Sequence, residues 1–362
     1  IALTGMALVN PLENLPLVAV FAVIAAFGSA TQDVAIDAYR VEAESRHRQA
    51  AMAATYVTGY RVALLAAGAG ALHVATIGSW NLAYAAMAAL MLVGMLTTLI
   101  IREPAVSIDR ATANLESRVA DYLDHARHQG LRRDMTAWFI GAVICPFADF
   151  FKRYGLAALA ILLFIGTFRI SDIFMGVMAN PFYLDLGFSK GEIANVAAAF
   201  GLVMTLAGAG LGGVLVARFG IAPMLVGTAL MAPVTNLTFS GLALLGPEIH
   251  GLVFAIIADN VTGGMAISVL IAYLSSLTNT AYTATQYALF SSVMTLPGQF
   301  LGGFTGVLAA SVGWFWFFII AAFIGLPAFL LAILLLRIAH PDRVNRPGIE
   351  ENSTEAPSAK VP

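Results

Sequence analysis

The sequence predicts an all-α polytopic membrane protein, on three observations. Of its 362 residues, 59% are hydrophobic and 11% are charged, with a mean hydropathy of +0.84, whereas soluble domains carry about 25% charged residues. Nine apolar runs are each longer than the roughly 20 residues that a helix needs to cross a bilayer. Lysine and arginine gather in alternate connections between these runs. The net charge of −2 gives no basis for binding nucleic acid.

The apolar runs set the number and order of the helices. The predicted spans are 15–38, 50–76, 80–101, 155–182, 190–218, 221–246, 250–278, 284–311 and 313–338. Residues 1–10 are too short to cross about 30 Å of hydrocarbon, so we expect them to be the tail of a tenth helix. The glycine and alanine content of the spans predicts close helix–helix packing. The clearest run is Gly201, Gly208, Gly210, Gly212 and Gly213.

The basic residues predict the orientation, because cytoplasmic loops are enriched in lysine and arginine. The opposite set of connections holds only Lys190. The basic set carries Arg40, Arg46 and Arg48, the arginines of 102–153, Arg218, Arg337, Arg343 and Arg346. We therefore expect this set and the C-terminus to be cytoplasmic. The single cysteine, Cys145, excludes a disulfide framework.

Four segments follow from this pattern. They are a partial N-terminal helix bundle (1–101), a cytoplasmic linker (102–154), a C-terminal six-helix bundle (155–338) and a disordered polar tail (339–362). In the linker, the run 135–146 is apolar but too short to cross, which predicts an interfacial helix or, alternatively, a fragment packed beneath the bundle. Residues 49–54 and 286–291 open spans in the same direction, which indicates a parallel repeat of two halves. A six-plus-six protein without its first two helices and most of the third would show this pattern.

Charged residues inside the spans mark the candidate site, because a carboxylate at membrane depth is costly unless it is paired or hydrated. Asp33 and Asp37 are four residues apart and share one helix face. Arg61 cannot lose its charge, so it either pairs with Asp33 or projects into a cavity to meet an anionic substrate. We expect protonation of Asp33 to release Arg61 for the substrate carboxylate. A network of Asp37, Arg40 and Arg61 that locks one conformation is the alternative.

The second half carries its own polar set. Arg169 and Asp172 are three residues apart, which permits a local salt bridge, and Asp259 is an alternative partner for Arg169. The predicted residues for proton coupling or gating are Asp33, Asp37, Asp172 and Asp259; those for substrate binding are Arg61, Tyr60, Gln32, Arg169, Asn260, Gln286 and Gln299; and those for a cytoplasmic gate are Arg40 and Arg218. No residues have metal-ligand spacing and no phosphate-binding loop is present, so we expect no metal, no cofactor and an ion gradient as the energy source.

Two motifs of the first half, Ser29-Ala-Thr-Gln-Asp33 with Asp37-Ala-Tyr-Arg40 and then Gly59-Tyr-Arg61, are similar to the fourth- and fifth-span motifs of AmpG-type muropeptide permeases, a family of the major facilitator superfamily. Residues 259–265 and 283–291 resemble that family's tenth- and eleventh-span patterns, and residues 212–220 resemble the superfamily's cytoplasmic loop motif. The tenth-span pattern departs from some members in carrying Asp259 in place of glutamate, which keeps the chemistry but shortens the reach.

The resemblance implies a major facilitator fold and an alternating-access importer of the bacterial inner membrane, driven by protons. Its expected substrate is the anhydromuramyl muropeptide, imported for peptidoglycan recycling. We therefore expect a transporter and not an enzyme, acting as a monomer in the lipid bilayer on an anionic amino-sugar peptide. One alternative is transport of another anionic solute, such as an organic acid or an acyl-CoA-like compound. The other is a prenyltransferase-like membrane enzyme, in which Asp33 and Asp37 would hold magnesium diphosphate.

Overall fold

The computed structural model describes residues 1–10, 14–44, 48–104 and 140–338, and all regular secondary structure in these ranges is helical. Eight helices there are long and apolar enough to cross a membrane. They are Leu15–Ala43, Ala51–Ile77, Trp80–Ile100, Ala157–Leu186, Ile193–Phe219, Ile221–Leu245, Ile249–Leu277 and Thr305–Arg337. The predicted all-α membrane fold is confirmed. The predicted span 284–311 corresponds in part to a helix outside these eight, so the total of nine spans stays a prediction.

The N-terminal half consists of α1 (Ala2–Leu8), α2 (Leu15–Ala43), α3 (Gln49–Leu65), α4 (Ala71–Ile77) and α5 (Trp80–Ile100). A π-helical turn, Ala66–Gly70, joins α3 to α4 as one span. Asn14 and Ser79 begin α2 and α5, because their side-chain oxygens accept hydrogen bonds from backbone N–H groups that have no partner inside the helix.

The C-terminal half consists of α9 (Ala157–Phe168), α10 (Ile170–Leu186), α11 (Lys190–Glu192), α12 (Gly201–Phe219), α13 (Ile221–Leu245), α14 (Ile249–Leu277), α15 (Thr283–Gly302) and α16 (Thr305–Ile338). The π-helical turn Ile193–Phe200 leads into α12. The predicted span 155–182 is interrupted at Arg169, where ψ is 1°, and it extends to Leu186. At Gly313, φ is +76° and α16 bends, close to the predicted boundary, although α15 already ends at Gly302.

Glycines let α12 and α14 approach each other closely, and some of them belong to the glycine run that the sequence analysis identified. The backbone of Val261 occupies the space that a side chain at Gly208 would need, and the backbone of Thr205 does the same at Gly264. Such contacts supply packing energy between helices in lipid, where the hydrophobic effect does not. A side chain at Gly210 would meet no other atom within 4 Å.

Most buried apolar side chains lie in the C-terminal half. One cluster surrounds Phe164 and Phe290, and another surrounds Phe182 and Phe318. A small third cluster joins α3 to α12 and α14. In the described part of the chain the C-terminal half is therefore packed more tightly than the N-terminal half, which contacts it through α2 and α3.

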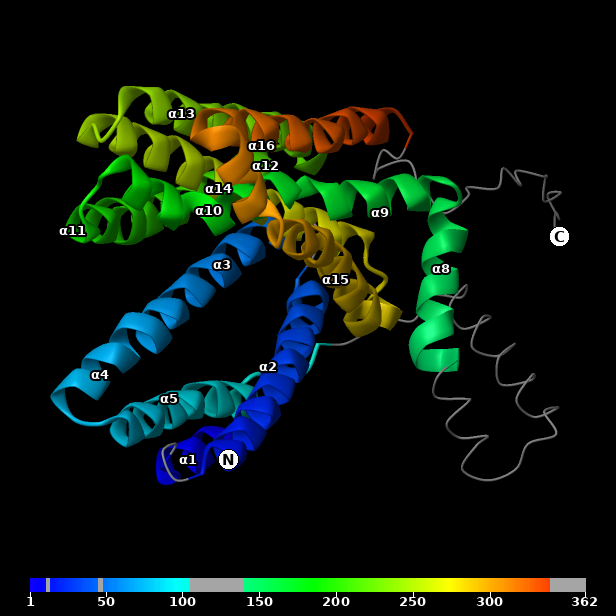
Figure 1. The fold of residues 1–362 in the computed structure, drawn as a ribbon. Coiled ribbons are helices and arrows are strands. Elements are labelled where there is room, and N and C mark those ends of the chain that lie inside the picture. Colours follow the sequence, from blue (N-terminus) through cyan, green and yellow to red (C-terminus); the bar gives the residue numbers. More distant parts are fainter. Residues whose placement is uncertain (11–13, 45–47, 105–139, 339–362) are drawn as a thin grey trace, which may run out of the picture.

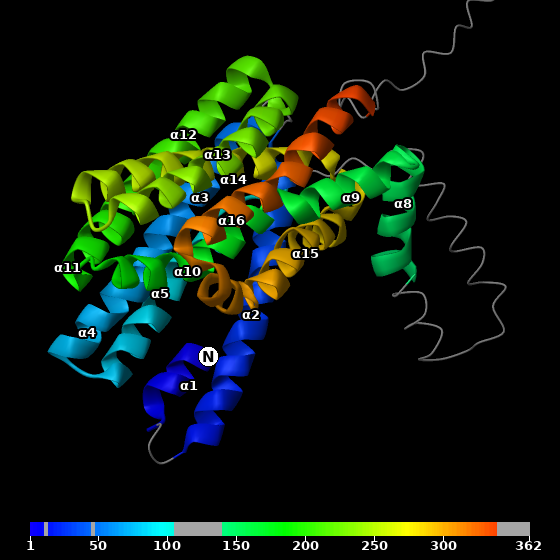
Figure 2. The ribbon, with the colours of Figure 1, turned by 45° about the horizontal axis from the view of Figure 1, so that its top comes forward.

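The two halves meet at one end of the bundle. There α3 packs against α12 and α14, and α2 packs against α15. Figures 1 and 2 show the C-terminal end of α2 and the N-terminal end of α3 reaching the C-terminal half, while α1 and α5 lie away from it. By sequence, these two ends carry Arg40 and Gln49. We call this end, which also carries Arg153, the arginine-rich end.

The predicted linker (102–154) falls partly outside the described residues, and the predicted tail (339–362) lies wholly outside them. From residue 140 onward the chain forms a π-helical turn, Ile140–Ile144, and then α8 (Cys145–Tyr154). This helix packs against α9 and α15, and Phe150 is fully buried. The predicted run 135–146 lies partly outside the described residues and shares only Cys145 and Pro146 with α8, so its two alternatives stay open.

Candidate functional site

A cavity of about 360 Å³ lies between the two halves. Its wall comes from α3 on one side and from α10, α12, α14 and the turn before α12 on the other. Its polar lining residues are Arg61, Arg169, Asp172, Asn180, Tyr183, Thr205, Asp259 and Asn260. A cleft of this size, with a few polar groups that converge in an apolar wall, is the usual form of a small-molecule site.

Arg61 is the polar contribution of the N-terminal half to this wall. Its side chain is half-buried and forms no ion pair or hydrogen bond within the described ranges. The predicted pair with Asp33 is not formed, because Asp33 is exposed and accepts a hydrogen bond from the Tyr56 hydroxyl at 3.3 Å. Release of Arg61 by protonation of Asp33 therefore has no counterpart in this structure. Of its two predicted positions, Arg61 takes the one in the cavity.

The break between α9 and α10 places Arg169 in the same cavity. Its Nε lies 4.0 Å from Asp172 Oδ2, so the salt bridge that the spacing predicted is present, at the outer limit of such contacts. Arg61 and Arg169 come from different halves, yet they are near enough for their charges to repel. Two guanidinium groups facing one cavity suit an anion, because each can donate two hydrogen bonds to a carboxylate.

Asp259 and Asn260 reach the cavity from α14. Asn260 is held in place, because its Oδ1 accepts a hydrogen bond from the Thr205 hydroxyl at 2.8 Å and its Nδ2 donates to Ile256 O at 3.0 Å. Asp259 has no such partner in the described part of the chain, and the charge of Asp172 repels it. The predicted alternative pair of Asp259 with Arg169 is not formed.

A second polar cluster joins the halves at the arginine-rich end. Arg40 is 3% exposed, and its Nη1 donates to Ser275 Oγ at 2.8 Å. Its Nη2 lies 3.5 Å from Asp37 Oδ1. The guanidinium also lies over the rings of Tyr287, at 5.0 Å, and Tyr56, at 5.6 Å, a favourable cation–π geometry. Asp37 and Arg40 thus hold α2 against α14 and α15.

Sequence reasoning missed three members of this cluster, Ser275, Tyr56 and Tyr287, and also the supporting role of Gln49. The Gln49 amide nitrogen donates to the carbonyls of Arg40, Val41 and Glu44, which have no helical partner at the end of α2. The signal for Tyr287 was its place beside Gln286 in the motif 283–291. No local sequence pattern identified Ser275 as a member of this cluster.

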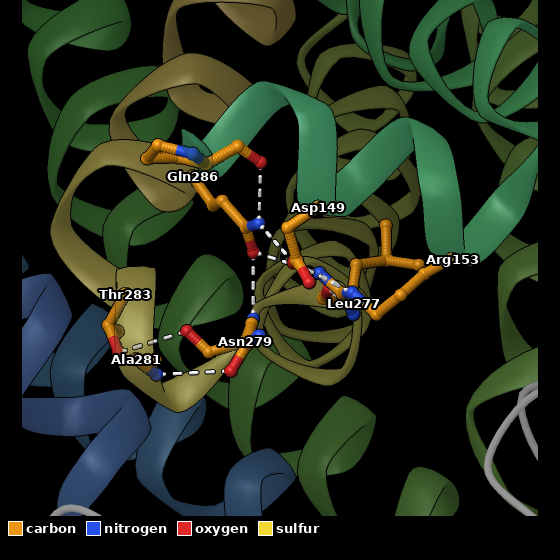
Figure 3. Close-up of polar contacts among 8 residues, drawn as sticks. Asp149, Arg153, Leu277, Asn279, Ala281, Thr283 and Gln286 are labelled. Atoms are coloured by element: carbon orange, nitrogen blue, oxygen red, sulfur yellow. Dashed lines mark hydrogen bonds and ion pairs between the residues drawn. The ribbon is translucent and has the colours of Figure 1, made fainter. Parts of the chain in front are cut away.

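Gln286, which was predicted to contact the substrate, does not line the cavity. Its side chain is 1% exposed and ties α8 to α15, as Figure 3 shows. Nε2 donates to Pro146 O and to Asp149 Oδ2, each at 2.9 Å, and Oε1 accepts from Arg153 Nη2 at 3.0 Å. The network also includes Asn279 N, which donates to Gln286 Oε1 at 2.8 Å.

The remaining predicted residues do not line the cavity. Gln32, Tyr60, Arg218 and Gln299 are exposed. Arg218 lies over the ring of Phe219, on its own helix, and makes no ion pair with the N-terminal half in the described ranges. The structure thus brings together Arg61, Arg169, Asp172, Asp259 and Asn260, and separately Asp37 and Arg40.

Comparison with known proteins agrees with this architecture. Residues 157–361 match the Major Facilitator Superfamily. The proton:xylose symporter XylE covers 94% of this chain, which spans 78% of XylE, with a TM-score of 0.68 and 14% identity. The E. coli fucose:proton symporter FucP covers 92%, with a TM-score of 0.62. These two likenesses show the fold.

A relative in sequence shows the family, and a second relative is similar over most of this chain. "Putative transporter AmpG 4" of Rickettsia conorii is 33% identical over 337 residues, which are 92% of this chain and 76% of that protein. "Anhydromuropeptide permease" of Escherichia coli K12 is 28% identical over 348 residues, which are 95% of this chain and 65% of the permease. Proteins of this kind are multi-pass membrane transporters and not enzymes, which excludes the prenyltransferase alternative. The chain belongs to the AmpG-type transporters of the major facilitator superfamily.

Proposed function

We propose that this protein imports anhydromuropeptides across the bacterial inner membrane, together with protons, and thereby supplies peptidoglycan recycling. The name of the E. coli relative supports the substrate. The observation that carries the proposal is the position of Arg61, a cation without a partner in the described ranges, in a cavity that also contains Arg169.

The substrate class follows from these two cations. The peptide part of a muropeptide carries carboxylates, and guanidinium groups bind carboxylates with paired hydrogen bonds. Arg61 belongs to the N-terminal half and Arg169 to the C-terminal half. A carboxylate bound by both would draw the halves together, which links substrate binding to the change between the two open states.

The direction of opening follows from the orientation. If basic loops are cytoplasmic, the arginine-rich end and the C-terminus face the cytoplasm. The Arg40 cluster then closes the cytoplasmic side in this structure. Import requires that this cluster separates after the substrate has bound. The transport unit in this proposal is a monomer, because the cavity lies within one chain.

The test is uptake of radiolabelled anhydromuropeptide into cells without their own permease. We expect uptake that an uncoupler abolishes and that Arg61→Ala lowers at least tenfold, since a hydrogen bond to a charged group contributes roughly 1.5–3 kcal/mol. Arg102→Ala, which removes an exposed arginine outside the cavity, is the matched control and should leave uptake unchanged. Equal uptake by wild type and Arg61→Ala would contradict the cavity assignment.

A second outcome concerns the substrate alone. If a well-expressed wild-type protein takes up no anhydromuropeptide, the substrate proposal fails. The two arginines would then point to another anionic solute, and competition for uptake by organic acids or acyl-CoA-like compounds would identify its class.

A further inference from the structure

We propose that Asp259 is the carboxylate that takes up the coupling proton, and that it does so as a substrate carboxylate enters the cavity. This inference rests on the proposed function for the identity of the substrate. It does not rest on Asp33, the residue that sequence reasoning favoured, because Asp33 lies outside the cavity.

Asp259 is distinguished by what it lacks. It lines the cavity, but it forms no ion pair and no hydrogen bond with any described residue. The other candidate carboxylates all have partners: Asp172 has Arg169, Asp37 has Arg40, and Asp33 has Tyr56. A carboxylate without a cation or donor to stabilise its charge is the one that accepts a proton most readily.

The ionisable groups that line the cavity together with Asp259 come from three elements. They are Arg61 of α3, Arg169 at the α9–α10 junction, and Asp172 and Tyr183 of α10. Of the helices packed against α14, α13 has no charged residue and α12 has one only in its last turn. Asp259 therefore responds to the charges in the cavity rather than to a fixed partner.

The charges of the cavity balance before the substrate enters. Two guanidinium groups, which stay protonated, face two carboxylates. An arriving substrate carboxylate adds a negative charge, and in a site of low dielectric constant this excess is poorly screened. Transfer of one proton from water to Asp259 restores the balance, while Asp172 keeps its charge beside Arg169. The expected coupling is one proton for each substrate negative charge that the site neutralises.

Reconstitution into liposomes separates coupling from binding. Asp259→Asn should retain exchange of labelled for unlabelled anhydromuropeptide without a gradient, but an imposed proton gradient should no longer drive accumulation beyond equal concentrations. Asp259→Glu should restore accumulation. Asp185→Asn, which removes an exposed carboxylate of α10 outside the cavity, is the matched control and should keep both activities. Asp33→Asn should keep proton-driven accumulation.

A measurement without substrate tests Asp259 on its own. An infrared carbonyl band of a protonated carboxyl should appear as the pH is lowered in the purified wild-type protein and in Asp33→Asn, and it should be absent from Asp259→Asn. If Asp259→Asn keeps this band, or still accumulates substrate with the proton gradient, the inference is wrong while the transport proposal stands. If wild type exchanges no anhydromuropeptide but loses the band on Asp259→Asn, the substrate proposal fails and Asp259 remains the proton site.

Discussion

Arg40 of α2 donates a hydrogen bond to Ser275 of α14 over 2.8 Å, and this contact joins two residues that are 235 positions apart in the chain. It belongs to a buried cluster in which Asp37 supplies the negative charge and two tyrosine rings cover the guanidinium. In the proposed transport cycle this contact must break whenever the arginine-rich end opens.

Removal of Arg40 should open the arginine-rich end. Arg40→Ala deletes a charge-assisted hydrogen bond worth roughly 1.5–3 kcal/mol and leaves Asp37 buried without a cation, so the closed form should lose at least tenfold in population. Spin labels on exposed residues of α2 and α15 would report the distance, with the buried Cys145 unlabelled. Arg48→Ala, with a side chain 70% exposed, is the control. An unchanged distance distribution in Arg40→Ala would show that the cluster does not hold the gate.

The ion pair between Arg169 and Asp172 should contribute to the free energy of unfolding. Arg169→Ala leaves Asp172 without its cation and should destabilise the protein by about 1–3 kcal/mol, whereas Arg169→Ala with Asp172→Asn should recover most of that loss. Thermal unfolding of the purified protein in detergent measures both. Neither variant should transport, because both lack the Arg169 guanidinium that is proposed to bind the substrate carboxylate. Additive effects of the two changes on stability would mean that the 4.0 Å contact contributes nothing.

The contact between α12 and α14 should not tolerate a side chain at Gly264. A Cβ there meets the backbone of Thr205 and Ala209, so Gly264→Ala should destabilise the protein by about 1–3 kcal/mol through forced separation of the helices. Gly210→Ala on α12 meets nothing within 4 Å and should be neutral or stabilising, since alanine favours helix. Equal melting temperatures for the two variants would contradict this packing.

Gln286 should act on α8 and not on the substrate. Gln286→Leu leaves Arg153 and the Pro146 carbonyl without this partner, at roughly 1–3 kcal/mol for a buried group left unpaired, so amide exchange of α8 should accelerate. Substrate affinity should stay the same. Gln299→Leu, an exposed site on the same helix, is the control. Lower affinity with unchanged exchange in α8 would return Gln286 to the substrate site.

The placement of charged side chains separates what could be predicted from what could not. Arg169 and Asp172 were predictable as a pair because both lie on the same stretch of chain. Asp33 and Arg61 lie on neighbouring helices and were expected to meet, but Asp33 contacts α3 at Tyr56, five residues before Arg61. Gln286 and Tyr287 show that adjacent residues on one helix can belong to different clusters. Neighbours on a helix point about 100° apart, so one binds α8 and the other covers Arg40.

The sequence by itself determined the class of protein, the course of its helices and the set of charges available inside the membrane, because the hydrocarbon thickness acts on each apolar run separately. Only the tertiary structure decided which of those charges share a cavity. That choice depends on how each helix is rotated and how closely it packs, as Gly208 and Gly264 allow for α12 and α14. It gathered Arg61, Arg169 and Asp259 from segments far apart in the chain, and no local pattern contains that information.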